Sequence, residues 1–142
     1  MLVAFLCAGN TCRSPIAEAI AHAGSGNGGA DFVSAGTDAR SADAAAETAV
    51  RVMAEVGIDI SAHSSRTLDA AFKQAPDLVY VMTAEQAQRV REIHPDLADR
   101  IHLLNPNGED IVDPNGGDIA DYRRTRDLIT SAVAGRAPEW KV

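Results

Sequence analysis

Short runs rich in apolar and β-forming residues recur along the chain and alternate with longer, helix-like segments. Such runs indicate strands that are buried on both faces of a sheet. We predict four strands, at residues 2–6, 31–35, 78–82 and 101–104. Helical spacing or good helix formers predict helices at residues 16–23, 43–56, 68–74, 84–94 and 119–134. The alternation predicts an α/β fold: a four-stranded, parallel, twisted sheet with helices on both faces, in three layers.

Individual residues mark several helix boundaries. Pro15 suits the first turn of a helix, where its missing N–H costs nothing. Gly57 is expected to end the helix at 43–56. Thr83 is expected to cap the next helix, with Gln86 completing a capping box, and Pro95 to end that helix.

Composition and charge exclude several classes of protein. The 142 residues fit a single domain, residues 1–142, and 46% of them are hydrophobic, which is enough for a core. A net charge of −7 repels nucleic acids and anionic membrane surfaces, so we expect neither as a partner. Two cysteines do not make a secreted disulfide framework, and the apolar N-terminus has no basic n-region. We therefore expect a cytoplasmic protein with reduced thiols.

The most informative motif, C-A-G-N-T-C-R-S-P, stands between the first predicted strand and the first predicted helix. Parallel sheets bind ligands beyond the carboxyl ends of their strands, and a helix N-terminus offers free N–H groups and a positive dipole end. A loop that curls between Cys7 and Arg13 would therefore bind phosphate. Gly9 and Asn10 tolerate the positive φ angles of such a curl, and Arg13 can hold two phosphoryl oxygens. The same surroundings favour Cys7 as a thiolate, with Ser14 donating a hydrogen bond to it.

This motif resembles the low-molecular-weight protein-tyrosine-phosphatase family. The likeness extends over nearly the whole chain, through S-A-G-T at 34–37, G-I-D at 57–59, H-S-S-R at 63–66 and D-P at 113–114. The resemblance implies a phosphocysteine intermediate, with no metal and no cofactor. It implies that Cys7 is the nucleophile and Arg13 the phosphate clamp of a loop completed by Ala8, Gly9, Asn10, Thr11, Cys12 and Ser14. Asn10 and Ser34 would hold the loop's shape, with His63 as a structural hydrogen-bonding residue near the cleft.

The leaving group also needs a proton, and Asp113 is the best candidate to donate it. Asp113 lies in a polar loop at residues 105–117 and precedes Pro114. A lone Asp-Pro pair is usually only a turn, but the resemblance implies an acid at this position. The hypothesis has two steps. Cys7 attacks phosphorus while Asp113 protonates the leaving atom, and Asp113 then activates the water that hydrolyses the phosphocysteine.

Thr11 bears on which phosphorylated residue is the substrate. Tyrosine phosphatases of the family usually carry a bulky aliphatic residue there, whereas the protein-arginine-phosphatase branch resembles this chain. In contrast, Asn115 replaces the aromatic residue that commonly follows the D-P pair, and Tyr122 fits the core better than the cleft. Phosphotyrosine and phosphoarginine proteins or peptides both remain candidate partners, with a slight preference for phosphoarginine. Inorganic phosphate would be the product, and the enzyme is expected to be a monomer.

Other functions remain open at this point. A thiol-dependent arsenate reductase would share the scaffold, although many of these enzymes need downstream cysteines and none follows Cys12. A non-catalytic phosphopeptide-binding module would not need both Cys7 and Asp113. A reversible Cys7–Cys12 disulfide is a further hypothesis, beside a plain packing role for Cys12.

Three further patterns are interpreted without a functional role. The glycines at 24–29 match G-x-G-x-x-G, but they follow a helix and precede a strand, which is the reverse of a dinucleotide site, so we expect a connector. Arg123 and Arg124 are expected on a solvated helix face. The histidines lack zinc-binding spacing: His22, His63, His94 and His102.

Overall fold

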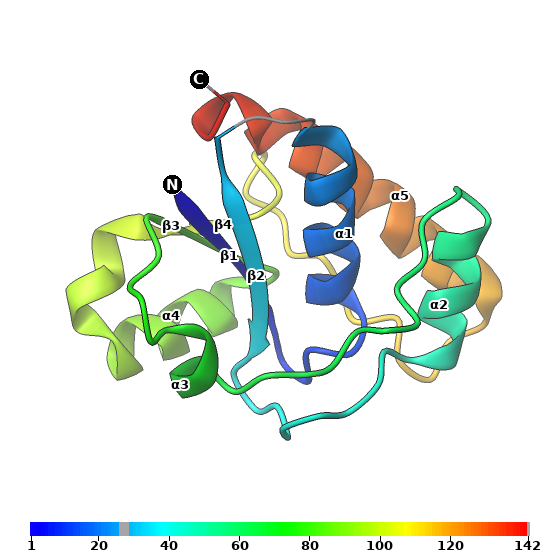
Figure 1. Ribbon diagram of the computed structural model, residues 1–142, viewed down its shortest axis with the longest axis horizontal. Coiled ribbons are helices and arrows are strands. Elements are labelled where there is room, and N and C mark those ends of the chain that lie inside the picture. Colours follow the sequence, from blue (N-terminus) through cyan, green and yellow to red (C-terminus); the bar gives the residue numbers. More distant parts are fainter. Residues whose placement is uncertain (26–28, 142) are drawn as a thin grey trace.

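The computed structural model describes residues 1–25 and 29–141. Its strands are β1 (Leu2–Cys7), β2 (Asp31–Gly36), β3 (Leu78–Val81) and β4 (Ile101–Leu103). They form one parallel sheet in the order β2-β1-β3-β4 (Figure 1), in which Cys7 pairs with Gly36. The predicted strands and the parallel α/β sheet are confirmed.

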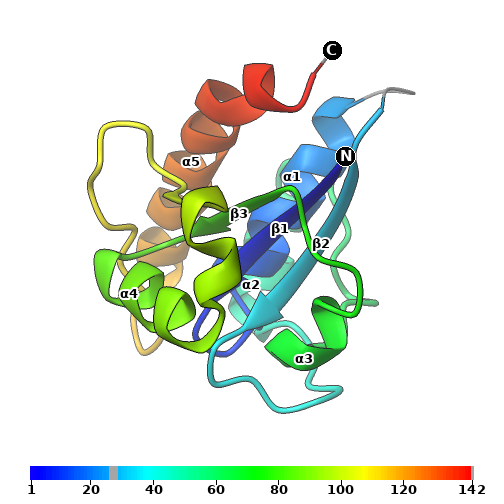
Figure 2. The same cartoon turned by 90° about the vertical axis from the view of Figure 1, so that its left-hand side faces the viewer.

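Helices cover both faces of the sheet (Figures 1 and 2). On one face lie α1 (Arg13–Ser25) and α5 (Ile119–Arg136), with α2 (Glu47–Ala54) packed against α5. On the other face lie α3 (Leu68–Ala71) and α4 (Ala84–Ile93), and two short 3-10 helices are η1 (Pro95–Arg100) and η2 (Ala137–Glu139). Alternate residues of β1 enter the two cores: Phe5 stacks near Tyr80 on the first face, and Leu6 packs on the second. Burial on both faces explains the uninterrupted apolar character of this strand.

Several predicted helix boundaries are confirmed. Gly57 follows α2 with a φ of 78°, and Pro95 follows α4. Thr83 caps α4 by accepting a hydrogen bond from the Gln86 N–H at 3.2 Å. The capping box is only half right, because the Gln86 side chain accepts from the Met82 N–H at 3.0 Å and not from that of Thr83.

The helix predicted from residue 43 begins later, at Glu47. Ala44 instead forms an isolated bridge with Ser64, and the Ala46 N–H donates to the Thr11 carbonyl at 2.8 Å. The alanines favour a helix locally, but hydrogen bonds to distant segments satisfy this backbone in an extended form. As a result, Ala46 lies against the loop that follows β1, and Asp43 and Ala44 lie against residues 64–65.

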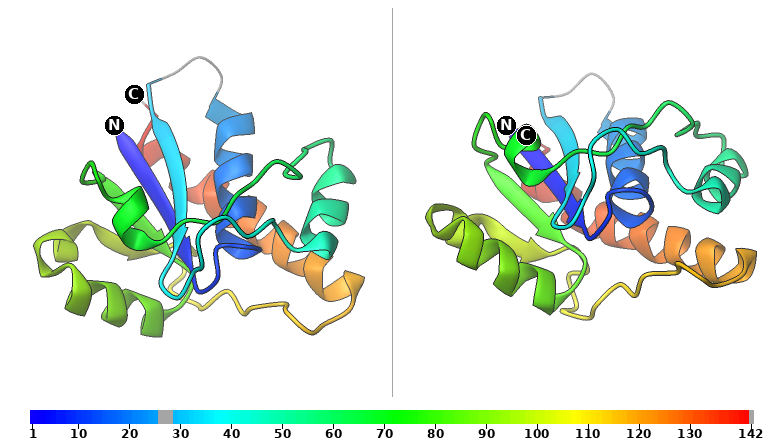
Figure 3. Two further views of the ribbon diagram at one scale, coloured as in Figure 1. Left: turned by 60° about the horizontal axis from the view of Figure 1, so that its bottom comes forward. Right: turned by 90° about the horizontal axis from the view of Figure 1, so that it is seen from below.

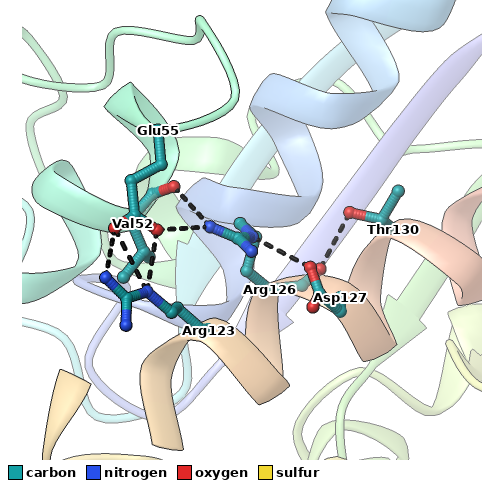
Figure 4. Close-up of polar contacts among 6 residues, drawn as sticks. All are labelled: Val52, Glu55, Arg123, Arg126, Asp127 and Thr130. Carbon is teal, nitrogen blue, oxygen red and sulfur yellow. Dashed lines mark hydrogen bonds and ion pairs between the residues drawn. The ribbon is translucent and has the colours of Figure 1, made fainter. Parts of the chain in front are cut away.

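An ion-pair cluster joins α2 to α5 (Figure 4). Glu55, directly after α2, accepts hydrogen bonds from Arg123 Nε at 3.0 Å and from Arg126 Nη1 at 2.8 Å. Arg126 also donates to the Val52 carbonyl and to Asp127. The pKa of Glu55 falls to about 2, mainly because Arg123 hydrogen-bonds its carboxylate. Arg123 and Arg124 are exposed, as predicted for a solvated helix face, and the packing of α2 on α5 also brings Glu55 to Arg123.

The carboxyl ends of the strands meet at one edge of the sheet, which Figure 3 turns toward the viewer. The loop between β1 and α1 lies there, as does the start of the long connection from β2 to α2. Two segments from distant parts of the sequence reach the same edge. Thr67 forms an isolated bridge with Gly36, and the Arg13 side chain donates to the Ile111 carbonyl. The predicted phosphate-binding loop therefore lies where ligands of parallel sheets bind.

Candidate active site

The chain turns sharply after β1, with Cys7 at the end of the strand and Arg13 at the start of α1. Two carbonyls at the start of the turn accept hydrogen bonds from the next connection: Cys7 from the Thr37 N–H and Ala8 from the Asp38 N–H, each at 2.9 Å. Within the described residues, the backbone N–H groups of 9–12 have no acceptor. A curled loop whose N–H groups are unpaired provides a binding site for an anion.

Asn10 holds the loop in its curled shape. Its φ of 56° lies in the left-handed region, which asparagine tolerates better than most residues, and its side chain is completely buried. Asn10 Nδ2 donates to Ser14 Oγ at 2.8 Å, and Asn10 Oδ1 accepts from the Arg66 N–H at 2.8 Å. The Asn10 carbonyl accepts from His63 Nε2 at 2.7 Å. Asn10 thereby links the loop to Ser14 at the start of α1 and to the segment of His63 and Arg66. His63 makes the hydrogen-bonding contact that was predicted for it.

The sulfur of Cys7 lies at the N-terminus of α1. Ser14 Oγ is 2.9 Å from Cys7 Sγ, and the Ser14 N–H donates to the same sulfur at 3.5 Å. The first turn of α1 carries no acidic residue, and Pro15 takes its third position. Hydrogen-bond donors and the positive end of a helix dipole both stabilise negative charge on this sulfur.

Arg13 connects the loop to the segment that carries Asp113. The Arg13 side chain is only 5% exposed, and its Nη1 donates to the Ile111 carbonyl at 2.8 Å. Its Nη2 lies 3.6 Å from Asp113 Oδ2. The other Asp113 oxygen accepts from the Asn115 N–H at 3.0 Å. The structure thus brings together Cys7, Arg13 and Asp113, the three residues that the sequence pattern selected for chemistry.

A cleft of about 320 Å³ opens above this loop. Asn115 lies on its wall, at the place where the family resemblance leads us to expect an aromatic residue. Tyr122 is buried in the core, as predicted, but it also lines the cleft. The lining residues are Cys7, Ala8, Gly9, Thr11, Cys12, Arg13, Asp38, Ala46, Asp113, Asn115 and Tyr122.

The two cysteines differ in their surroundings, although both thiols are free. Burial, reinforced by the charge of Cys7, raises the pKa of Cys12 to about 12. Cys12 is therefore a neutral thiol near pH 7.

The contacts of Ser65, Arg66 and Gly36 could not be predicted from the sequence pattern. Ser65 Oγ accepts from the Asp43 N–H at 2.8 Å and donates to the Arg40 carbonyl, which ties down the connection from β2 to α2. Arg66 acts through its backbone, since its N–H binds Asn10 and its carbonyl accepts from the Gly36 N–H. Gly36 leaves no room for a side chain, because a Cβ there would lie 2.4 Å from a loop carbonyl oxygen. The S-A-G-T and H-S-S-R likenesses marked these segments without revealing their contacts.

The predicted partnership of Ser34 with Asn10 is wrong. Ser34 is buried, but its hydroxyl has no hydrogen-bond partner in the part of the chain that the structure describes. It pairs with Phe5 in the sheet, two residues before the end of β1 at Cys7. The Asn10 side chain is instead occupied by Ser14 and the Arg66 N–H, which lie closer to the loop.

Residues 1–25 and 29–141 contain neither a cluster of metal-binding side chains nor a helix that could span a membrane. No group of three His, Cys, Asp or Glu side chains there is arranged to hold a metal ion. No helix in the same ranges has the length and apolar character that crossing a membrane requires. The glycine pattern at 24–29 lies partly outside the described residues.

Comparisons with known proteins agree with this geometry. The model of the family described as low molecular weight phosphotyrosine protein phosphatase matches residues 2–139. The probable low molecular weight protein-tyrosine-phosphatase EpsP of Ralstonia nicotianae is 32% identical, over 94% of this chain and 91% of its own length. An arsenate reductase of Halalkalibacterium halodurans is 35% identical, over 90% of this chain and 88% of its own.

Solved structures show the same likeness. A mutant of the YwlE arginine phosphatase with a phosphorylated active-site serine matches with a TM-score of 0.90 and 30% identity. The match covers 98% of this chain and 95% of that one. Because the family model spans nearly all of the sequence, and Cys7, Arg13 and Asp113 meet at one cleft, the resemblance predicted from the motifs is confirmed. The chain belongs to the low molecular weight phosphotyrosine protein phosphatase family.

Proposed function

We propose that this chain is a cysteine-dependent phosphatase that hydrolyses phosphorylated protein residues through a phosphocysteine intermediate. The observation that carries this proposal is the position of Cys7 Sγ. The sulfur is in contact with the hydroxyl and the N–H of Ser14 at the start of α1, and it lines the same cleft as the buried Arg13. A sulfur in these surroundings is stabilised as an anion beside a binding site for a tetrahedral oxyanion. The YwlE relative with a phosphorylated active-site serine supports phosphoryl transfer to an enzyme side chain.

In the first step, the Cys7 thiolate attacks phosphorus and forms the S–P bond. The bond between phosphorus and the leaving atom breaks, and the leaving atom keeps its electron pair and takes a proton from Asp113. Arg13 and the N–H groups of residues 9–12 hold the three non-bridging oxygens, where charge must be stabilised.

In the second step, water attacks the phosphocysteine. Asp113, now a carboxylate, takes a proton from this water as its oxygen bonds to phosphorus. The S–P bond breaks, inorganic phosphate is released, and Cys7 leaves as a thiolate. Ser14, with its hydroxyl 2.9 Å from the sulfur, stabilises the returning negative charge.

The lining of the cleft favours phosphoarginine over phosphotyrosine in the substrate protein. Thr11, Asp38 and Asn115 line the cleft, and their side chains can accept hydrogen bonds. A phosphorylated guanidino group keeps N–H donors that such acceptors bind, whereas a phenyl ring does not. Tyr122, the aromatic residue of the lining, is 95% buried and offers little surface for stacking. The likeness to an arginine phosphatase supports the same preference.

Arsenate reduction is the second candidate, because a relative of that name is 35% identical to this chain. Converting arsenate to arsenite takes two electrons, so a second thiol must act after Cys7. Cys12 is the other cysteine of the sequence, and its raised pKa keeps it protonated. An external thiol would therefore be required, and the phosphatase reaction is favoured.

The test measures hydrolysis of p-nitrophenyl phosphate and of two matched peptides, one with phosphoarginine and one with phosphotyrosine. We expect turnover by the wild-type protein, none by Cys7→Ser, and a higher kcat/KM for the phosphoarginine peptide. Full turnover by Cys7→Ser would overturn the mechanism. A higher kcat/KM for phosphotyrosine would overturn only the substrate preference. Arsenate-dependent consumption of dithiothreitol without phosphatase activity would identify a reductase.

We also infer that the enzyme works as a monomer in the cytoplasm. A catalytic thiolate needs a reducing compartment, and both thiols are free. The proposed site is complete within one chain, since Cys7, Arg13 and Asp113 line one cleft. Its partners would be phosphorylated proteins or peptides. Size-exclusion chromatography at the mass of a single chain would agree with this inference.

A further inference from the structure

A second groove, of about 470 Å³, lies beside the catalytic cleft. Asp113 and Asn115 line both, so the groove continues from the cleft across the loop that carries the acid. One wall is made by residues 112–117 and the other by one face of α5. The α5 residues of this wall recur at helical spacing: Asp121, Arg124, Thr125 and Leu128.

Two exposed apolar side chains border this groove. Val112 is 74% exposed and Leu128 is 48% exposed. The other large hydrophobic residues that the described chain exposes are Met1, Val56 and Ile93, and they line neither the groove nor the cleft. Apolar surface gathered beside a binding site, rather than scattered singly, is typical of a surface that contacts a partner.

The charges around the groove are mainly negative. Asp110, Asp113 and Asp121 line it, against the single cation Arg124 among its lining residues. Arg124 is itself paired with Asp121, and Asp113 is paired with Arg13, so Asp110 is the lining carboxylate that has no ion pair within the described residues. A second copy of this chain would bring its own net charge of −7 to an acidic surface, which disfavours self-association there. A cationic partner with apolar side chains is complementary to the groove.

We propose that this groove binds the segment of the substrate polypeptide that flanks the phosphorylated residue, and that it selects an apolar side chain beside basic ones. The inference rests on the proposed function: Asp113 and Asn115 line both the cleft and the groove, so a polypeptide whose phosphorylated side chain enters the cleft can continue into the groove across them. The apolar side chain packs between Val112 and Leu128. The basic side chains lie near the aspartates.

The experiment compares kcat/KM for two peptide sequences and one small substrate. Two are peptides with the same phosphorylated residue, flanked by Leu and Lys in one and by Gly and Ser in the other. Both are prepared with phosphoarginine and with phosphotyrosine, so that the comparison does not depend on the preferred residue. The third is p-nitrophenyl phosphate, which has no polypeptide to place in the groove, and Leu128 does not line the cleft. The variants are Leu128→Ser and Leu128→Lys. The matched controls are Ile93→Ser and Ile93→Lys, because Ile93 is also 48% exposed on a helix.

We expect the wild-type protein to prefer the Leu/Lys peptide. Leu128→Ser should lower kcat/KM for that peptide by about fivefold, and Leu128→Lys by about tenfold or more, because it adds repulsion to the lost contact. Hydrolysis of p-nitrophenyl phosphate should stay within about twofold of wild type, as should every activity of the Ile93 variants.

Equal turnover of both peptides by the wild type, or an unchanged Leu/Lys preference in both Leu128 variants, would overturn the groove proposal while leaving the phosphatase intact. Failure of the wild type on all four phosphopeptides and on p-nitrophenyl phosphate would instead overturn the proposed function. A peptide preference that vanished together with dimerisation of the protein would assign the groove to a second copy of the chain and overturn the proposal.

Discussion

Arg13 Nη2 lies 3.6 Å from Asp113 Oδ2, so the residue proposed to clamp the phosphoryl group meets the residue proposed to protonate the leaving group. Arg13 also donates to the Ile111 carbonyl, two residues before Asp113. The guanidinium therefore holds the segment of Asp113 in place, and in the proposed mechanism it would hold the phosphoryl oxygens as well. A phosphoryl group held by Arg13 would lie directly beside the carboxyl group of Asp113, which is proposed to donate a proton to the leaving atom.

Removing this acid should slow the first step most for leaving groups that need a proton. We expect Asp113→Ala to lower kcat by about 10²–10⁴-fold on a phosphopeptide, and less on p-nitrophenyl phosphate, whose leaving group departs without protonation. Glu109→Ala, an exposed change in the same loop, serves as the control and should leave kcat unchanged. A pH–rate profile of Asp113→Ala identical to that of wild type would argue against the proposed acid.

The two thiols should differ sharply in reactivity. Because the pKa of Cys12 is about 12, only about one Cys12 in 10⁵ is a thiolate at pH 7, and thiolate is the reactive form. We expect iodoacetamide at pH 7 to modify Cys7 and to spare Cys12, as located by fragment mass spectrometry. Labelling of Cys12 should rise only as the pH approaches 12.

Inorganic phosphate should protect Cys7 from this labelling, because it occupies the same loop. Cys7→Ser protein should remain unlabelled at pH 7. Modification of Cys12 ahead of Cys7 in wild-type protein would contradict the assignment of the nucleophile.

Gly36 should resist substitution for a steric reason. A Cβ at this position would lie 2.4 Å from the Ala8 carbonyl oxygen and 3.0 Å from the Asn10 nitrogen, both in the backbone of the catalytic loop. We expect Gly36→Ala to lower the free energy of unfolding by about 1–3 kcal/mol, and to lower kcat because the loop must shift. Denaturant unfolding and steady-state kinetics measure the two effects.

Gly24→Ala is the matched control, since a Cβ there meets nothing within 4 Å and the residue lies in α1. Alanine is the better helix former by about 1 kcal/mol, so this variant should be as stable as wild type or slightly more stable. If Gly36→Ala behaved in the same way, the close approach of β2 to the loop would not matter for function.

The Glu55 cluster should make stability depend on pH in the acidic range. The folded pKa of Glu55 is about 2, below its ordinary value of 4.5, chiefly because of its hydrogen bonds with Arg123. A carboxyl group with a lowered folded pKa stabilises the protein above its unfolded pKa, and this contribution is lost as the pH falls. We therefore expect the Glu55 contribution to be complete above about pH 4.5 and to disappear towards pH 2.

Thermal unfolding of wild type and Glu55→Gln between pH 2 and pH 7 tests this expectation. The difference in Tm between the two proteins should be largest near neutral pH and should shrink below about pH 4.5. Glu47→Gln, at the other end of α2, should show a smaller difference at every pH. A Glu55→Gln difference that did not change with pH would mean that the effect is packing rather than charge.

The amino-acid sequence by itself determined the sheet and the chemistry of the first loop. Uninterrupted apolar residues from Leu2 onward predict a buried strand, and the residues from Cys7 to Ser14 predict an oxyanion site at the start of a helix. These are local features. Strand and helix periodicity is visible over a few residues, and Cys7, Gly9 and Arg13 lie in one short loop. From the sequence, it was the resemblance to the phosphatase family that assigned Asp113 to the site, because an Asp-Pro pair by itself usually indicates only a turn.

Tertiary structure alone decided what holds that loop in place. Asn10 receives its hydrogen bonds from His63 and Arg66, 53 and 56 positions away, and Arg13 reaches Ile111, 98 positions away. The same packing left Ser34 outside the network and kept residues 43–46 extended despite their alanines. The physical reason is that hydrogen bonds between distant segments depend on how the elements pack, which no local preference specifies.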